Sequence, residues 1–159
     1  MEIRLAQPKD TDRLMEIFAH ARQFMQQTGN ARQWINNYPQ RSLIENDIEM
    51  GHCYVCLHQG GIVATFCFIE GPDPTYSLIE DGQWLFHDPY HVIHRIASDG
   101  SMKGIVRQII DWCSKHSQSL RADTHEDNKI MQHLLLSNGF TRCGIIYVAN
   151  GTPRIAYQR

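Results

Sequence analysis

One stretch near the middle of the chain decides the fold, and it reads His94-Arg95-Ile96-Ala97-Ser98-Asp99-Gly100-Ser101-Met102-Lys103-Gly104. Its first half completes a strand expected over His91 to Ser98, and its turn opens into an amphipathic helix expected over Lys103 to Lys115. The first amides of such a helix have no partner within the helix and carry the positive end of its dipole, so they suit a phosphate group. Lys103 adds a positive charge at the same place. The alternative is a plain strand-turn-helix connection with an ordinary surface lysine, because glycine turns before helices are common.

The segments on either side of this stretch alternate between strand and helix patterns. Upstream, the periodicity predicts a strand over Glu2 to Ala6, a helix ending near Gln27, a helix over Ser42 to Glu49, and strands over His52 to His58 and Ile62 to Glu70. Downstream, it predicts a strand over Leu120 to Thr124, a helix over Asp127 to Ser137, and strands over Phe140 to Val148 and Arg154 to Tyr157. Residues 71 to 89 lack such a pattern and are predicted to form a long irregular loop. A loop of that length in a compact domain more often has a function than none.

This order of elements predicts an α/β (α+β) fold in a single domain over residues 1–159. We expect a mixed, mostly antiparallel sheet of about six to seven strands, flanked by about four helices. The final strands offer an edge for pairing with a second copy of the chain, which makes a homodimer a candidate assembly.

The composition excludes several classes of protein. Hydrophobic residues make up 42% of the chain and charged residues 20%, which is ordinary for a soluble globular protein. The net charge of −2, without a Lys/Arg block, argues against a nucleic-acid partner. No apolar run approaches the roughly 20 residues that a membrane-spanning helix needs, and the N-terminus lacks the apolar core of a signal peptide. The five cysteines form no recognisable disulfide framework, so we expect reduced thiols and a cytoplasmic location.

Two further motifs carry a family resemblance. Arg121-Ala122-Asp123-Thr124-His125-Glu126-Asp127-Asn128 leads into a helix that ends Leu134-Leu135-Leu136-Ser137-Asn138-Gly139-Phe140. Together with the central stretch, these segments resemble the acetyl-CoA-binding core of the GNAT family of N-acetyltransferases, and more narrowly a bacterial subgroup with a His-Arg-Ile-Ala-Ser strand end. In that family a Q/R-x-x-G-x-G/A loop follows the fourth strand, an asparagine begins a later helix, and Gly-Phe leads into the next strand. The predicted element order matches the family fold over essentially the whole chain.

The resemblance implies acetyl-CoA as the co-substrate, no metal, and a set of cofactor-binding residues. Lys103 takes the Q/R position, and Asn128 takes the position of the helix-start asparagine. A bulged strand end offers backbone groups to the thioester and the pantetheine arm, and the first amides of the following helix hold the pyrophosphate. The strand-end residues are Ile96, Ala97 and Ser98. The amides that hold the pyrophosphate belong to Lys103, Gly104, Ile105 and Val106.

The sequence departs from the family pattern at three positions. Val106 and Gln108 stand at the two small positions of the loop, where a bulky side chain crowds the approach of phosphate to the backbone. Leu135 stands where many members carry a tyrosine that protonates the leaving thiolate. Cys143 and Tyr147 on the following strand are alternative thiolate acids, and a packing role is the competing interpretation for each.

The expected reaction places few demands on the protein. An acyl thioester is already reactive, so it needs proximity, an uncharged amine and a donor aimed at the carbonyl oxygen, for which the backbone amide of Ile96 is the candidate. His94 and His125 are the candidate bases because they lie nearest the expected thioester and histidine titrates near neutral pH. The alternative for each is a structural histidine that caps a helix or bonds a backbone carbonyl.

Two other groups of residues have competing interpretations. Trp34 and Tyr38 lie in the connector after the first helix, where they line an acceptor pocket or pin the connector onto the core. His87, His91 and His94, with Asp88, form the best metal-like cluster, but histidine ligands need convergent geometry and supporting partners.

The function expected from the sequence is therefore transfer of an acetyl group from acetyl-CoA to an amine of a small molecule or a peptide, by direct attack in a ternary complex. The alternative is a non-catalytic acyl-CoA-binding or sensory module on the same fold, which the departures at Val106, Gln108 and Leu135 favour.

Overall fold

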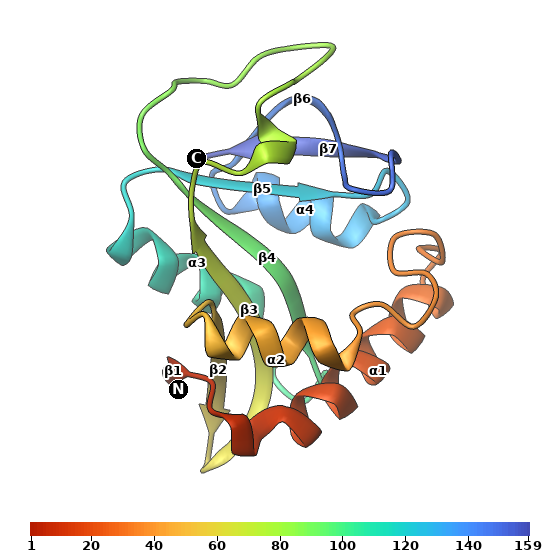
Figure 1. The fold of residues 1–159 in the computed structure, drawn as a ribbon, viewed down its shortest axis with the longest axis vertical. Coiled ribbons are helices and arrows are strands. Elements are labelled where there is room, and N and C mark those ends of the chain that lie inside the picture. Colours follow the sequence, from red (N-terminus) through yellow and green to blue (C-terminus); the bar gives the residue numbers. More distant parts are fainter. The chain divides into compact units, whose positions relative to one another are not determined.

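Seven strands and four α-helices follow one another in the order expected from the sequence, and two short 3₁₀ helices (η), which were not predicted, lie between them. The computed structural model describes residues 1–159, and Figure 1 traces the path of the chain. The elements in chain order are β1 (Glu2–Leu5), η1 (Pro8–Asp10), α1 (Thr11–Gln27), α2 (Arg41–Glu49), β2 (Cys53–His58), β3 (Gly61–Glu70), η2 (Pro74–Tyr76), β4 (His91–Ser98), α3 (Ile105–His116), β5 (Leu120–Thr124), α4 (Lys129–Ser137), β6 (Thr141–Tyr147) and β7 (Pro153–Gln158).

The strands form one sheet in the order β1-β2-β3-β4-β5-β7-β6. Antiparallel pairs join β1 to β2, β2 to β3, β5 to β7 and β7 to β6, whereas β4 pairs with β5 in parallel. The predicted α/β fold, with a mostly antiparallel open sheet and four helices, is thus confirmed. None of the helices is both long enough and apolar enough to cross a membrane.

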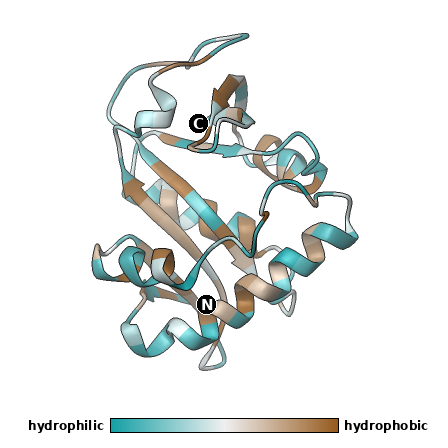
Figure 2. Cartoon of the chain, turned by 45° about the vertical axis from the view of Figure 1, so that its right-hand side comes forward, coloured by the Kyte–Doolittle hydropathy of each residue, from teal (hydrophilic) through white to brown (hydrophobic).

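By its internal packing the chain divides into two compact units, and β3, β4 and α3 each run from one unit into the other. The first unit comprises Met1–Phe68 and Arg95–Ile105. In it, α1 buries Leu14, Ile17, Phe18 and Ala21 at helical spacing, and Figure 2 shows the matching hydrophobic and hydrophilic stripes along this helix. The hairpin between β2 and β3 turns at Gln59 and Gly60, both with positive φ, as a tight two-residue turn requires.

The second unit comprises Ile69–His94 and Val106–Arg159. Its core gathers Tyr76, Trp84, Val92, Cys143, Ile146 and Ala156. The long segment Gly71–Tyr90, here called the strap, arches over β6 and β7 (Figure 1). The sequence predicted an irregular loop here, but the strap contains η2 and is tied down by backbone hydrogen bonds.

Two helices begin later than the sequence predicted, and each delay has a local cause. Helix α3 was expected from Lys103 but begins at Ile105, because Gly104 adopts a φ of 73° that no helix can contain. Helix α4 was expected from Asp127 but begins at Lys129, because Asn128 is its N-cap and its side chain accepts a hydrogen bond from the Met131 amide.

Candidate functional site

The predicted phosphate loop is a tight turn built around Asp99. The Asp99 carboxylate accepts hydrogen bonds from the backbone amide of Ser101 at 2.9 Å and from its hydroxyl at 2.6 Å. Its other oxygen pairs with Arg13 at 2.8 Å, so the acidic charge in the loop is matched by a cation. Burial by itself would raise the pKa of Asp99, but these partners hold it below the ordinary value.

The entry to α3 is open and carries no acidic side chain in its first turn. Lys103 and Gly104 are exposed, and a Cβ placed on Gly104 would meet no heavy atom within 4 Å. Gly104 is therefore needed for its positive φ, and the space beside the backbone is free. Val106 and Gln108, the two departures from the small-residue pattern, both lie within α3 and are half-buried.

Strand β4 is continuous, but its backbone has a positive φ just before Ile96, a feature here called the kink. Arg95 has a φ of 51°, an uncommon value for a residue with a side chain. Its guanidinium makes two bonds to the buried Asp47 carboxylate, at 2.9 and 3.0 Å, and donates to the Tyr38 hydroxyl at 3.2 Å. A bidentate pair of this kind fixes the Arg95 side chain, and with it the strand that carries Ile96, Ala97 and Ser98.

The two candidate substrate residues have different surroundings. Trp34 is buried and packs edge-on against Phe18, with ring centroids 5.8 Å apart, and against Tyr38 at 5.9 Å. Tyr38 is half-buried, and Arg22 donates to its backbone carbonyl. Trp34 thus pins the connector onto α1, while Tyr38 keeps part of its ring at the surface.

His94, one of the two candidate bases, bonds to a residue of the strap. Its Nε2 lies 3.0 Å from Asp73 Oδ2, and the His94 side chain is 23% exposed. The structure gives Nδ1 no hydrogen-bond partner within the chain. Burial would raise the pKa of Asp73, but hydrogen bonds from His94 and Thr75 outweigh it and lower the pKa to about 2.

Tyr76 and Asp123 lie next to this pair. The Tyr76 ring centroid is 6.2 Å from that of His94, and its hydroxyl donates to Asp123 Oδ2 at 2.6 Å. Complete burial, followed by the charge of Asp123, raises the pKa of Tyr76 well above its ordinary value, so the phenol stays protonated.

His125, the other candidate base, is buried beside the N-cap of α4. Its Nδ1 lies 2.9 Å from the backbone nitrogen of Asp127, which can only donate, so Nδ1 is the acceptor. A neutral imidazole has a single lone-pair nitrogen, and in His125 that nitrogen caps the turn into α4. His125 therefore has the structural, helix-capping role that was its alternative interpretation. In His94, by contrast, Nδ1 has no hydrogen-bond partner within the chain.

Cys143 and Tyr147, the two residues considered as thiolate acids, both make other hydrogen bonds, and Leu135 replaces the tyrosine that many family members carry. Leu135 is buried in the core, as is Cys143, whose thiol donates to the Thr141 carbonyl at 3.3 Å. Tyr147 is exposed, and its hydroxyl donates to Glu80 at 3.0 Å, which raises the pKa of the phenol.

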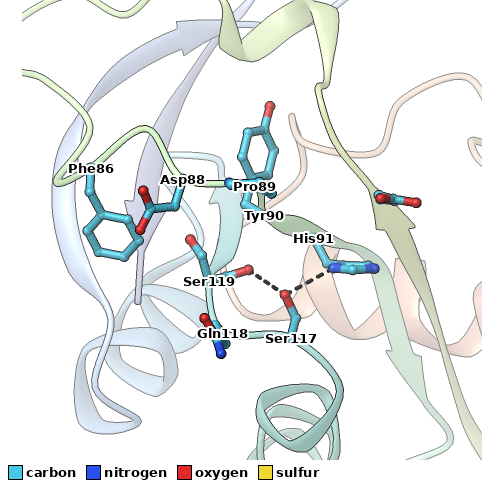
Figure 3. A pocket seen from close by; sticks show the side chains of 9 residues that line it. Phe86, Asp88, Pro89, Tyr90, His91, Ser117, Gln118 and Ser119 are labelled. Atoms are coloured by element: carbon cyan, nitrogen blue, oxygen red, sulfur yellow. Dashed lines mark hydrogen bonds between the residues drawn. The ribbon is translucent and has the colours of Figure 1, made fainter.

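The metal-like histidine cluster does not converge. His91 Nδ1 bonds to the Ser117 hydroxyl at 2.9 Å, whereas His94 bonds to Asp73. No group of three or more His, Cys, Asp or Glu side chains is arranged to hold a metal ion. His91 and Asp88 instead line a cavity of about 510 Å³ at the starts of β4 and β5, where Figure 3 shows Ser117 between His91 and Ser119.

The sequence did not identify Asp73, Tyr76 or Arg121 as members of this region. The buried Arg121 guanidinium lies 3.9 Å from the centroid of the Trp84 ring and 4.0 Å from that of Tyr90, and it donates to the Phe86 carbonyl. Asp73-Pro74-Thr75 is a recognisable turn signal, in which Asp73 Oδ1 accepts from the Thr75 amide and hydroxyl. The turn could be predicted from the sequence. The hydrogen bond between Asp73 and His94 could not, because the two residues are 21 positions apart in the chain.

Comparison with solved structures finds similar chains, although no family model and no curated protein sequence matches. An acetyltransferase of the GNAT family from Streptococcus agalactiae is 32% identical over 99% of this chain and 94% of its own, with a TM-score of 0.90. A GNAT family acetyltransferase from Listeria monocytogenes is 22% identical over 99% of this chain and 93% of its own, with a TM-score of 0.74. A protein from Salmonella typhimurium, assigned as an acetyltransferase and solved with its cofactor acetyl-CoA, is 17% identical over 100% of this chain and 92% of its own, with a TM-score of 0.63.

Proposed function

The chain belongs to the GNAT family of acetyltransferases, and on that premise we propose that it transfers an acetyl group from acetyl-CoA to an amine. The observation that carries this proposal is the 32% identity to a GNAT acetyltransferase over nearly the full length of both chains. The acetyl-CoA bound by the Salmonella typhimurium protein supports the choice of cofactor. The His-Arg-Ile-Ala-Ser strand end at residues 94–98 further suggests the bacterial subgroup that shares this motif.

The entry to α3 supports phosphate binding. The first amides of this helix and the exposed Lys103 combine a dipole end with a full positive charge, and no acidic side chain follows in the first turn. The open space beside Gly104 allows a phosphate to approach the backbone closely. We assign the pyrophosphate to the amides of Lys103, Gly104, Ile105 and Val106, and the pantetheine arm to Ile96, Ala97 and Ser98. Asn128 remains a candidate cofactor-binding residue.

The positive φ of Gly104 also favours a different register for the family loop pattern. If the first small position is Gly104, the second is Val106 and the Q/R position falls on Ser101. Gln108 then lies outside the pattern, and Val106 is the one departure left within it. Lys103 keeps its role as the exposed cation beside the phosphate.

His94 is the base in this proposal. When bound, acetyl-CoA supplies a reactive thioester whose acetyl group passes to the amine as CoA leaves as a thiolate. His94 takes the proton of the ammonium group at Nδ1, so that the amine has a free lone pair. The kink at Arg95 supports a role for the Ile96 amide as the donor to the thioester oxygen.

No tyrosine acid is needed on α4 for the leaving group. A thiolate is stable near neutral pH, because an ordinary thiol has a pKa of about 8.5. The proton that the attacking nitrogen loses as the amide forms can pass through water to the thiolate, so the burial of Leu135 is compatible with catalysis. Tyr38, half-buried beside the Arg95 guanidinium, remains our candidate for contact with the acceptor amine, with Trp34 behind it. The five free cysteines support a reducing compartment, which we propose to be the cytoplasm.

The cofactor assignment is tested by thermal unfolding with and without millimolar acetyl-CoA. A ligand that binds only the folded protein raises the Tm, so the parent protein should show a clear upward shift. Lys103→Glu should lose most of that shift, because it places a negative charge beside the pyrophosphate. Lys115→Glu is the matched control, since it makes the same charge change at the other end of α3. Equal shifts in all three proteins would place the cofactor elsewhere, and no shift in the parent would refute the proposal.

A further inference from the structure

The ionisation state of Asp73 determines which nitrogen of His94 carries the proton. The pKa of Asp73 is lowered to about 2, so at neutral pH the group is a carboxylate and can only accept hydrogen bonds. The 3.0 Å contact with His94 therefore requires a proton on Nε2. A neutral imidazole carries one proton, so the lone pair of His94 lies on Nδ1, which has no partner within the chain.

Asp73 is itself firmly held. Its Oδ1 accepts two hydrogen bonds from Thr75, from the amide at 2.9 Å and from the hydroxyl at 2.8 Å. Its backbone amide donates to the Tyr90 hydroxyl at 2.8 Å. Because Oδ1 is occupied by Thr75, the remaining oxygen, Oδ2, is the one turned to His94.

Asp73 is the one charged side chain that bonds to His94. The titratable and charged groups around the pair within the same unit are Tyr76, Tyr90, Asp123 and Arg121, whose guanidinium lies 4.0 Å from the centroid of the Tyr90 ring. The Tyr76 phenol stays protonated and donates a hydrogen bond to Asp123, so the second carboxylate bonds to Tyr76. Asp73 is thus the anion in direct contact with the imidazole.

We propose that Asp73 is a positioning residue that fixes the tautomer of His94 and thereby makes Nδ1 the proton acceptor for the amine. This inference rests on the proposed acetyl transfer. Asp73 does not touch the reacting atoms. It acts through His94 in two ways, by holding the proton on Nε2 and by stabilising the imidazolium that forms once Nδ1 has taken a proton.

The variant Asp73→Asn tests the tautomer directly. The Thr75 amide and hydroxyl will keep the asparagine carbonyl oxygen in the place of Oδ1, so its NH₂ group will face His94. A donor at that position requires a lone pair on Nε2 and moves the imidazole proton to Nδ1. We expect the ¹⁵N shifts of His94 to report this exchange of tautomers. Asp88→Asn is the control, because it removes one exposed carboxylate from the same strap.

Acetyl transfer by the same proteins completes the test. With Nδ1 protonated the base is lost, so kcat of Asp73→Asn should fall about 10²- to 10⁴-fold, with little change in the KM for acetyl-CoA. Asp88→Asn should keep the kcat of the parent protein. Unchanged His94 ¹⁵N shifts, or a changed tautomer with an unchanged kcat, would overturn the assignment of Asp73. A parent protein that acetylates no amine would overturn the proposed function instead, and the ¹⁵N shifts would still decide whether Asp73 fixes the tautomer.

Discussion

In our proposal, single side chains at the junction of the strap and β4 carry the chemistry of this protein. Asp73 is a charged residue whose partners, His94 and Thr75, lie within its own unit. Its carboxylate stays ionised to a lower pH than an ordinary aspartate, and this difference links it to the stability of the fold as well as to the tautomer of His94.

The lowered pKa of Asp73 predicts an acid-dependent loss of stability. A carboxylate whose pKa falls on folding contributes stability above its ordinary pKa of 3.8, and that contribution is lost as the pH falls toward the folded value of about 2. The shift corresponds to about 2 kcal/mol. Urea unfolding across this pH range should therefore show the parent losing about 2 kcal/mol more than Asp73→Asn. Parallel losses in the two proteins would mean that the carboxylate is not held by His94 and Thr75 in solution.

Sequence reasoning could find some of these side chains and not others. His94 stood out because it belongs to the stretch that decides the fold and because histidine titrates near neutral pH. Asp73 and Arg121 depend on contacts between segments far apart in the chain, which no local pattern encodes. The choice between His94 and His125 likewise depended on which nitrogen is already bonded, a matter of three-dimensional geometry.

The strap is the element that brings Asp73 to His94, and its own position depends on close contact with β6. Glu80 and Ile145 exchange backbone hydrogen bonds at 2.9 and 2.8 Å. Gly144 makes this approach possible, because a Cβ there would lie 2.5 Å from the Glu80 carbonyl oxygen. Gly82 has the same role on the strap, where a Cβ would overlap the Cys143 carbonyl oxygen.

We predict that Gly144→Ala loosens the strap. The added methyl group meets the Glu80 carbonyl and the Ile79 side chain, so the strap must shift, at a cost of about 1 to 3 kcal/mol. Hydrogen exchange at the amides of Glu80 and Ile145 should become faster, and the Tm should fall. Gly61→Ala is the control, since its added methyl group would meet nothing closer than 3.8 Å. Protected amides in Gly144→Ala would contradict this account of how the strap is held.

The sequence predicted elements better than it predicted their ends. All eleven predicted strands and helices are present and in order, because hydrophobic periodicity and turn residues act locally. The starts of α3 and α4 were wrong by two residues, since a glycine with positive φ and an asparagine N-cap sit inside the predicted helices. The ordered conformation of the strap could not be predicted, because the residues that hydrogen-bond to its backbone lie on β6 and β7.

At the scale of the whole molecule, the fold and the family are established. The edge strands of the sheet are β1 and β6. Glu80 of the strap pairs with Ile145 on β6, so this edge is partly covered. The homodimer expected through the final strands stays a prediction, and it must use the part of β6 that the strap leaves open, or another surface.

The central claim is that this chain moves an acetyl group from acetyl-CoA to an amine with His94 as the base. The most direct test supplies acetyl-CoA labelled in the acetyl group with a panel of small-molecule and peptide amines, and measures labelled amide and free CoA together. We predict that one or more amines yield amide and CoA mole for mole. In His94→Gln the rate should be about 10²- to 10⁴-fold lower, with acetyl-CoA binding retained. Saturable acetyl-CoA binding with no labelled amide from any amine would contradict the claim, and would identify the protein as a non-catalytic acyl-CoA-binding module on the same fold.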